Sequence, residues 1–178
     1  GKAYAQLPLT TDYTAAKMFL RTINTDMVPT QGTDIGNAVE MALSYFETGK
    51  EQNRVLFILS DGESHEEGAL EASELASENG ILIHAIGLGT LDGGPIPIKR
   101  NGVIKGYKKD NEDKVVVTKM DPAMLQQLAL STEGNFIDGM NTKETIEFIK
   151  SSIGKMEQVE SETEMYTDYE DQFQWFLA

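Results

Sequence analysis

The chain has 178 residues, of which 40% are hydrophobic, and this is enough for the core of one α/β domain. Its formal net charge of −14 gives a surface that repels nucleic acid and anionic lipid headgroups, so we expect no nucleic-acid partner. It contains no cysteine and two histidines, which excludes disulfides and thiolate catalysis and argues against a zinc or haem site.

Helical and strand patterns alternate from the start of the chain. Residues 11–24 and 33–47 carry apolar side chains at helical spacing, and a loop with Pro29 and Gly32 separates them. The next segment, "RVLFILS" over residues 54–60, is a continuous apolar run of the kind found in parallel strands covered on both faces.

The middle of the chain continues this alternation and then interrupts it. A third helix is predicted over residues 66–78, ending at Asn79-Gly80, and "ILIHAIGLG" over residues 81–89 is the next buried strand. Residues 92–119 are polar and rich in turn formers, and we interpret them as a surface hairpin that turns at residues 110–113.

Alternation resumes after this insertion. Asp121-Pro122 opens a helix that Gly134 closes, "NFIDG" is a short strand, and Asn141 with Glu144 forms a possible capping box for a last helix. The order predicts a doubly wound, mostly parallel sheet with helices on both faces. We place this domain at residues 1–156 and an acidic, aromatic, membrane-proximal tail at residues 157–178.

Two loops are expected to meet at the carboxyl ends of the strands, where such sheets bind ligands. "PTQGTDIG" and "SDGES" together supply the candidate site residues Gly32, Thr33, Asp34, Ser60, Asp61, Gly62 and Glu63. A threonine hydroxyl and a carboxylate are hard oxygen donors suited to Mg²⁺, Mn²⁺ or Ca²⁺. Spacing by itself favours plainer roles, namely a helix N-cap at Thr33 and a turn residue at Asp61.

Longer phrases of the sequence resemble a known family. "TQGTDIGNAVEMAL" and "RVLFILSDGESHEEGALEASELASENGILIHAIGLG" are similar to von Willebrand factor type A (VWA) domains. "QLPLTTDY", "GGPIPI" and "YEDQFQWF" resemble in particular the BatB type of the bacterial Bat (Bacteroides aerotolerance) group. VWA domains build a metal-ion-dependent adhesion site from three loops, and the resemblance assigns its threonine to Thr33 and its aspartate to Asp61, with Mg²⁺ as the expected ion.

The third loop of such a site, Asp-x-Ser-x-Ser, does not occur in this chain. We therefore expect the first strand, first helix and first metal loop of the family to lie outside the sequence. Because that strand would be central, the chain would expose unpaired strand groups and apolar surface without it. We expect the chain either to be part of a larger molecule or to exchange a strand with another one.

Other polar residues have plainer interpretations. Glu63, Glu66 and Glu67 fit a solvated helix start better than a second cation site, and His65 fits an exposed surface residue. His84 lies in an apolar strand and is expected to be a hydrogen-bonded core residue. "GLGTLDGG" lacks the third glycine of a dinucleotide motif, and "KDNEDK" fits a hairpin turn better than a calcium loop.

The sequence is compatible with three functions. The first is a non-enzymatic binding module in which a divalent ion bridges to an acidic residue of a partner. The second is a metal-assisted phosphatase or hydrolase, for which no general acid or phosphate-binding loop is evident. The third is a scaffold that binds no metal. The resemblance implies partners among other Bat-type VWA proteins and a MoxR-type AAA+ ATPase, with membrane segments outside this chain in the bacterial inner membrane and the domain facing the periplasm.

Overall fold

The computed structural model describes residues 2–24, 27–28, 32–46, 54–63, 68–100, 103–110 and 112–170, without the side chains of Lys99 and residues 157–170. Within these residues, the main sheet has the order β1 (Arg54–Ser60), β2 (Ile81–Gly87) and β7 (Phe136–Asp138), and both pairs of neighbours are parallel. Each crossover between these strands contains a helix. The predicted α/β class, with a doubly wound parallel sheet, is confirmed.

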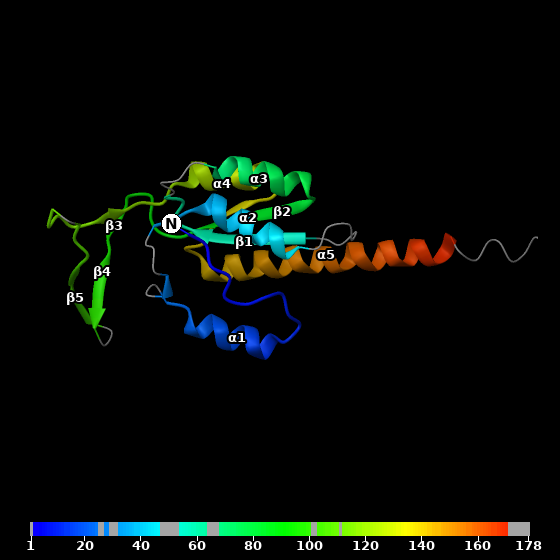
Figure 1. Ribbon diagram of the computed structural model, residues 1–178, viewed down its shortest axis with the longest axis horizontal. Helices are drawn as coiled ribbons and strands as arrows, with labels where there is room; N and C mark the ends of the chain where they lie inside the picture. Colours follow the sequence, from blue (N-terminus) through cyan, green and yellow to red (C-terminus); the bar gives the residue numbers. More distant parts are fainter. Residues whose placement is uncertain are drawn as a thin grey trace, which may run out of the picture.

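Helices cover both faces of the sheet (Figure 1). On one face, α2 (Ile35–Tyr45), α3 (Ala69–Glu78) and α4 (Pro122–Leu130) pack with β2 around the main core. The buried aliphatic side chains of this core are Ile35, Val39, Ala69, Ala72, Ala76, Ile81, Ile83, Ala85, Leu125, Leu128 and Ala129. The opposite face is covered by α5 (Thr142–Glu170), and α1 (Tyr13–Thr22) lies on the same side.

Local chemistry fixes the helix ends. Asp121 accepts hydrogen bonds from the amides of Ala123 and Met124, with Pro122 at the first helical position of α4. The helix ends at Leu130, and Gly134 then turns the chain back so that its amide donates to Ala129 O. A β-carbon at Gly134 would collide with the carbonyl of Ile83, so this turn requires glycine to pack against β2.

The burial of β1 differs from its prediction. Its apolar run predicts a strand covered on both faces, yet none of its residues is fully buried and Leu59 is 57% exposed. The reason is that β1 pairs with β2 alone and is the edge of the described sheet. In β2, by contrast, six of the seven residues are buried.

The third helix starts later than predicted. Gly68 is its N-cap, in the left-handed conformation at φ 106°, and α3 begins at Ala69. Residues 64–67, which include His65, Glu66 and Glu67, lie outside the described residues. The C-terminal end of α3 is as predicted, because Asn79 caps the helix and Gly80 follows with φ 66°.

The insertion contains more strand pairing than the sequence predicted. β4 (Pro97–Arg100) pairs with β5 (Val103–Tyr107), and β3 (Gly94–Pro95) pairs with β6 (Val117–Thr118) at the base. The predicted turn is also present, since Asp110 accepts from the amides of Glu112 and Lys114 and Lys109 forms an ion pair with Asp113. "KDNEDK" is therefore a hairpin turn.

The last helix is longer than expected. Asn141 caps it through the amide of Glu144, but α5 then continues without a break past Met156 to Glu170. The predicted domain boundary at residue 156 therefore does not coincide with the end of a structural element. Residues 171–178, with the aromatic side chains of Trp175 and Phe176, lie outside the described residues.

Candidate functional site

Asp61 stands at the carboxyl end of β1, immediately after the last strand residue. Its Oδ1 accepts a hydrogen bond from the amide of Glu63 at 3.2 Å, and Ser60 Oγ accepts from the amide of Gly62 at 3.1 Å. These bonds form a tight turn that holds the carboxylate at the edge of the sheet. The other carboxylate oxygen, Oδ2, makes no hydrogen bond with any described residue.

Gly62 locks this turn onto the start of α4. Its φ is +81°, and a β-carbon there would collide with the carbonyl of Asp121. The Asp121 amide in turn donates to the carbonyl of Asp61 at 2.8 Å. The backbone around Asp61 is thus fixed by a helix cap 60 positions further along the chain, which the sequence analysis identified as a cap but did not connect to the site.

Glu63 does not begin a helix. Its Oε1 accepts a hydrogen bond from the amide of Lys119, at 2.6 Å, and so ties the loop to the base of the insertion. The interpretation of Glu63 as a solvated helix start is therefore wrong. No local pattern reveals this contact, because its two residues are 56 positions apart in the sequence.

A groove of about 350 Å³ opens beside Asp61. It lies between the end of β1 and the base of the insertion, and its other described lining residues are Gly89, Thr90, Gly94, Pro95, Ile96, Pro97, Thr118, Lys119 and Met120. Among these lining residues, Lys119 is the one ionisable group besides Asp61. The insertion thus forms a wall of the site, which no local pattern of the sequence predicts.

The second loop places its residues as follows. Asp34, and not Thr33, is the N-cap of α2, since Asp34 Oδ1 accepts from the amide of Asn37 at 2.9 Å. Thr33 is half-buried and its hydroxyl makes no hydrogen bond with any described residue. Gly32 is exposed and has φ +121°, a conformation that favours glycine. The plain role as a helix cap therefore belongs to Asp34.

The two loops supply oxygen donors for a hard cation, but fewer than a complete site needs. The Thr33 hydroxyl and Asp61 Oδ2 are oxygen donors that no described protein group engages, and magnesium sites often use one carboxylate with hydroxyls and waters. Within the described residues, no group of three or more histidine and acidic side chains could hold a metal. The Thr33 hydroxyl and the Asp61 carboxylate would therefore be part of the ligand set of a hard cation, and Asp61 would be its charged ligand.

The sequence matches one known protein family. The model of the von Willebrand factor type A domain matches residues 1–136, which include both loops, β1, β2 and α4. The chain belongs to the VWA family. No curated protein matches it significantly.

Two solved structures support the assignment. An aerotolerance-related membrane protein from Bacteroides fragilis NCTC 9343, with multiple mutations to serines, is 38% identical with a TM-score of 0.79, over 88% of this chain and 76% of that one. The conserved hypothetical protein BatB from Bacteroides thetaiotaomicron is 37% identical with a TM-score of 0.79, over 89% and 76%. VWA domains are generally interaction modules. In the described part of this chain, no helix is long and apolar enough to cross a membrane.

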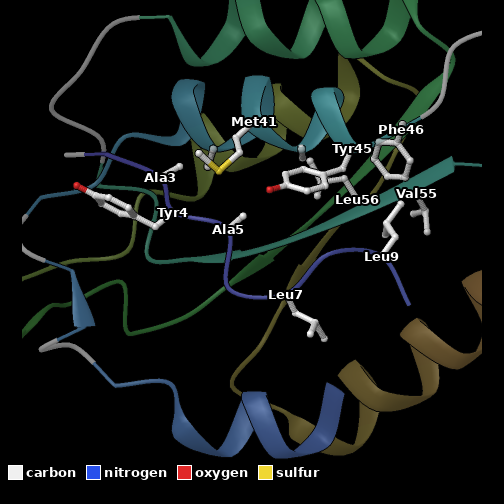
Figure 2. Close-up of a pocket in the computed structure, with 12 residues that line it drawn as sticks. Ala3, Tyr4, Ala5, Leu7, Leu9, Met41, Tyr45, Phe46, Val55 and Leu56 are labelled. Atoms are coloured by element: carbon white, nitrogen blue, oxygen red, sulfur yellow. The ribbon is translucent and has the colours of Figure 1, made fainter. Parts of the chain in front are cut away.

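A second, apolar pocket of about 370 Å³ lies along the open side of β1. The N-terminal segment, α2 and β1 enclose it, and Met41 and Tyr45 of α2 point toward this space (Figure 2). Its lining includes Val55 and Leu56 of β1, which explains their partial exposure. No described strand pairs with β1 on this side, so the pocket borders an open edge of the described sheet.

His84 occupies the other face of β2, away from the candidate site. It is 3% exposed, its Nδ1 accepts from the amide of Asn135 at 3.0 Å, and its ring packs edge-on against Phe148 of α5. Burial, together with the nearby charge of Lys155, lowers the pKa of His84 below its usual value of 6.5. The prediction that His84 is a hydrogen-bonded core residue is confirmed.

Proposed function

We propose that this VWA domain is a cation-dependent protein-interaction module of a bacterial envelope complex. Thr33 and Asp61 would hold a divalent cation, with Mg²⁺ preferred and Mn²⁺ or Ca²⁺ as substitutes. A bound cation supplies a coordination position that a carboxylate of a partner protein can fill. The remaining ligands would come from water and, by family resemblance, from a serine-bearing loop that this chain does not contain.

One observation supports this proposal most directly. Asp61 is held by its neighbours at the carboxyl edge of the sheet, beside a groove of about 350 Å³, and its Oδ2 accepts no hydrogen bond from any described residue. Asp34, and not Thr33, caps α2, and the Thr33 hydroxyl makes no hydrogen bond with any described residue. A hydrolase would need a general acid or base beside Asp61, and the described groove offers Lys119 alone.

The proposed partners rest on the family resemblance. One relative is described as an aerotolerance-related membrane protein and the other as BatB. We extend this to a role in aerotolerance or stress response, with other Bat-type VWA proteins and a MoxR-type AAA+ ATPase as the complex. The domain would be anchored to the inner membrane through segments outside this chain and would face the periplasm.

The test is a titration with Mn²⁺ followed by residue-resolved paramagnetic broadening of the amide signals. Broadening is expected first in residues 32–34 and 60–62. Asp61→Asn should abolish it, since the amide oxygen can still accept from Glu63 but the negative charge is gone. Asp138→Asn is the matched control, because Asp138 also ends a parallel strand and accepts from the amide two residues on, in Met140.

The two possible outcomes distinguish a specific cation site from nonspecific binding of cations to an acidic surface. An acidic protein attracts cations over its whole surface, and such binding would broaden many acidic positions and persist in Asp61→Asn. That result would remove the metal from the proposal and favour a metal-free scaffold. Broadening that is confined to the two loops and is retained in Asp138→Asn supports it.

A further inference from the structure

The insertion differs from the rest of the chain in charge. Residues 92–119 contain seven of the 15 basic residues and four of the 29 acidic ones, so their net charge is +3. The rest of the chain keeps eight basic and 25 acidic residues, a net charge of −17. We call β4, β5 and the turn that follows them, residues 97–116, the arm. The arm is a positive projection on a negative body (Figure 1).

The positive charge of the arm is concentrated on its first hairpin. In the turn that follows β5, Lys109 pairs with Asp113 at 3.0 Å and Lys114 with Glu112 at 2.6 Å, so both lysines there are engaged by acids. Arg100, Lys105 and Lys108 are exposed and make no ion pair with any described residue. They are therefore available for a partner that carries negative charge.

The same hairpin exposes apolar side chains on both faces. Tyr107 pairs with Pro97 and Ile98 pairs with Gly106, and successive pairs of an antiparallel ladder point to opposite faces, so Tyr107 and Ile98 lie on different faces of the hairpin. Ile98, Val103, Ile104 and Tyr107 are each exposed by about half, between 45% and 56%. Lysines on a strand edge can serve to prevent aggregation, but that does not account for apolar side chains on both faces.

A two-stranded hairpin with neither face covered is marginally stable in water, and exposed apolar patches of this kind mark docking sites. Together, the exposed basic and apolar groups indicate the surface that the arm fits. The partner should present carboxylates interspersed with aliphatic side chains.

The outer face of α3 has this chemistry. Ala69, Ala72, Ser73 and Ala76 point inward, whereas Leu70 and Leu75 are exposed together with Glu71, Glu74 and Glu78. The helix contains no basic residue. Its outer face thus combines three carboxylates with two leucines, a complement to the arm in charge and in apolar character.

The arm lies away from α3 of its own molecule (Figure 1). In Figure 1 the arm hangs below the left end of the sheet, whereas α3 lies above the sheet. We propose that the arm of one molecule docks on the outer face of α3 of a second copy. Because the two surfaces differ, the contact is head-to-tail and can be repeated along a chain of molecules. This inference does not depend on the metal site.

The association should be weak and sensitive to salt. Two copies with a net charge of −14 repel each other, so the arm must act at close range, within the Debye length of about 10 Å at 0.1 M salt. We expect the average mass in sedimentation equilibrium to rise with concentration beyond that of a dimer. We also expect a return toward monomer in about 0.5 M salt, where screening is stronger.

Charge reversal tests both surfaces. Lys105→Glu with Lys108→Glu alters the arm, and Glu71→Lys with Glu74→Lys alters α3. Each double variant alone should associate at least tenfold more weakly, because like charges then face each other. An equal mixture of the two should recover association, since each altered surface meets its opposite on the other variant.

The control makes an equal change in net charge on another part of the molecule. Lys143→Glu with Lys150→Glu, on exposed positions of α5, lowers the net charge as much as the arm variant does and should retain association. A chain that stays monomeric at high concentration and low salt overturns the proposal. So does association that survives the arm reversal, or a mixture that fails to recover it while both variants keep the melting temperature of the unaltered chain.

Discussion

The strands β1 and β2 are neighbours with similar sequences and different surroundings. Both are seven-residue apolar runs, paired in parallel along their whole length. β2 lies between β1 and β7 and is almost entirely buried, whereas β1 is at the edge of the described sheet beside an apolar pocket. A continuous apolar run therefore predicts a strand of the core sheet. How much of that strand is buried depends on the strands beside it.

The function of the two strands also differs. β2 contributes three buried residues to the core and β1 contributes none, whereas the turn that follows β1 carries Asp61. The strand that presents the candidate ligand is thus the one whose environment is incomplete within the described chain. Stability and cation binding should consequently respond to different substitutions.

The largest difference in the free energy of unfolding is expected between side-chain truncations in β2 and in β1. Ile83→Ala in β2 removes a fully buried side chain and should lower the free energy of unfolding by about 2–5 kcal/mol. Leu59→Ala in β1 should cost less than about 1 kcal/mol, because that side chain is 57% exposed. Urea unfolding followed by circular dichroism measures both. Similar losses would mean that β1 is covered in solution.

A smaller difference is expected for the glycines at the strand ends. Gly62→Ala after β1 forces a left-handed residue against the carbonyl of Asp121 and should cost about 2–3 kcal/mol. Gly87→Ala at the end of β2 meets the ends of the Met120 and Phe136 side chains, which can move, and should cost about 1 kcal/mol.

The same pair of glycine variants also tests the site. Gly62→Ala should weaken Mn²⁺ broadening at residues 60–62, because it displaces the turn that holds Asp61. Gly87→Ala should leave that broadening unchanged. Equal effects of the two variants on cation binding would argue that the rigid turn does not position Asp61.

The sequence predicted those features that local chemistry determines. The Asp121-Pro122 cap, the stop at Gly80, the buried run of β2 and the order of elements all depend on residues within one or two turns of each other. The candidate positions of Thr33 and Asp61 came from the family resemblance. The cation that they would hold remains a prediction.

The features that the sequence did not predict depend on contacts distant along the chain. Glu63 looks like part of an acidic helix start until Lys119 is found beside it. The insertion contains several polar segments that could pair as hairpins, and the register of β4 with β5, including its bulge after Ile98, is decided by pairing that no local pattern specifies. The edge position of β1 depends in the same way on strands and not on its own residues.

The smallest effect should come from His84, which links the two strands to α5. Its ring lies near Phe57, its partner in β1, and packs against Phe148. Because burial and Lys155 lower its pKa in the folded state, the unfolded chain binds a proton first as the pH falls below about 6.5. Folding should therefore lose stability on acidification, with a slope of at most about 1.4 kcal/mol per pH unit, the limit for one proton.

The measurement compares the unaltered chain with His84→Gln between pH 7 and pH 5.5, where most carboxylates stay ionised. Glutamine can accept the Asn135 hydrogen bond without titrating, so the difference in slope between the two proteins isolates the histidine. Lys155→Gln should reduce that difference by removing the neighbouring positive charge. Identical slopes in all three would show that α5 does not hold His84 neutral against the sheet, and that the closed packing on this side of β2 is looser than its burial indicates.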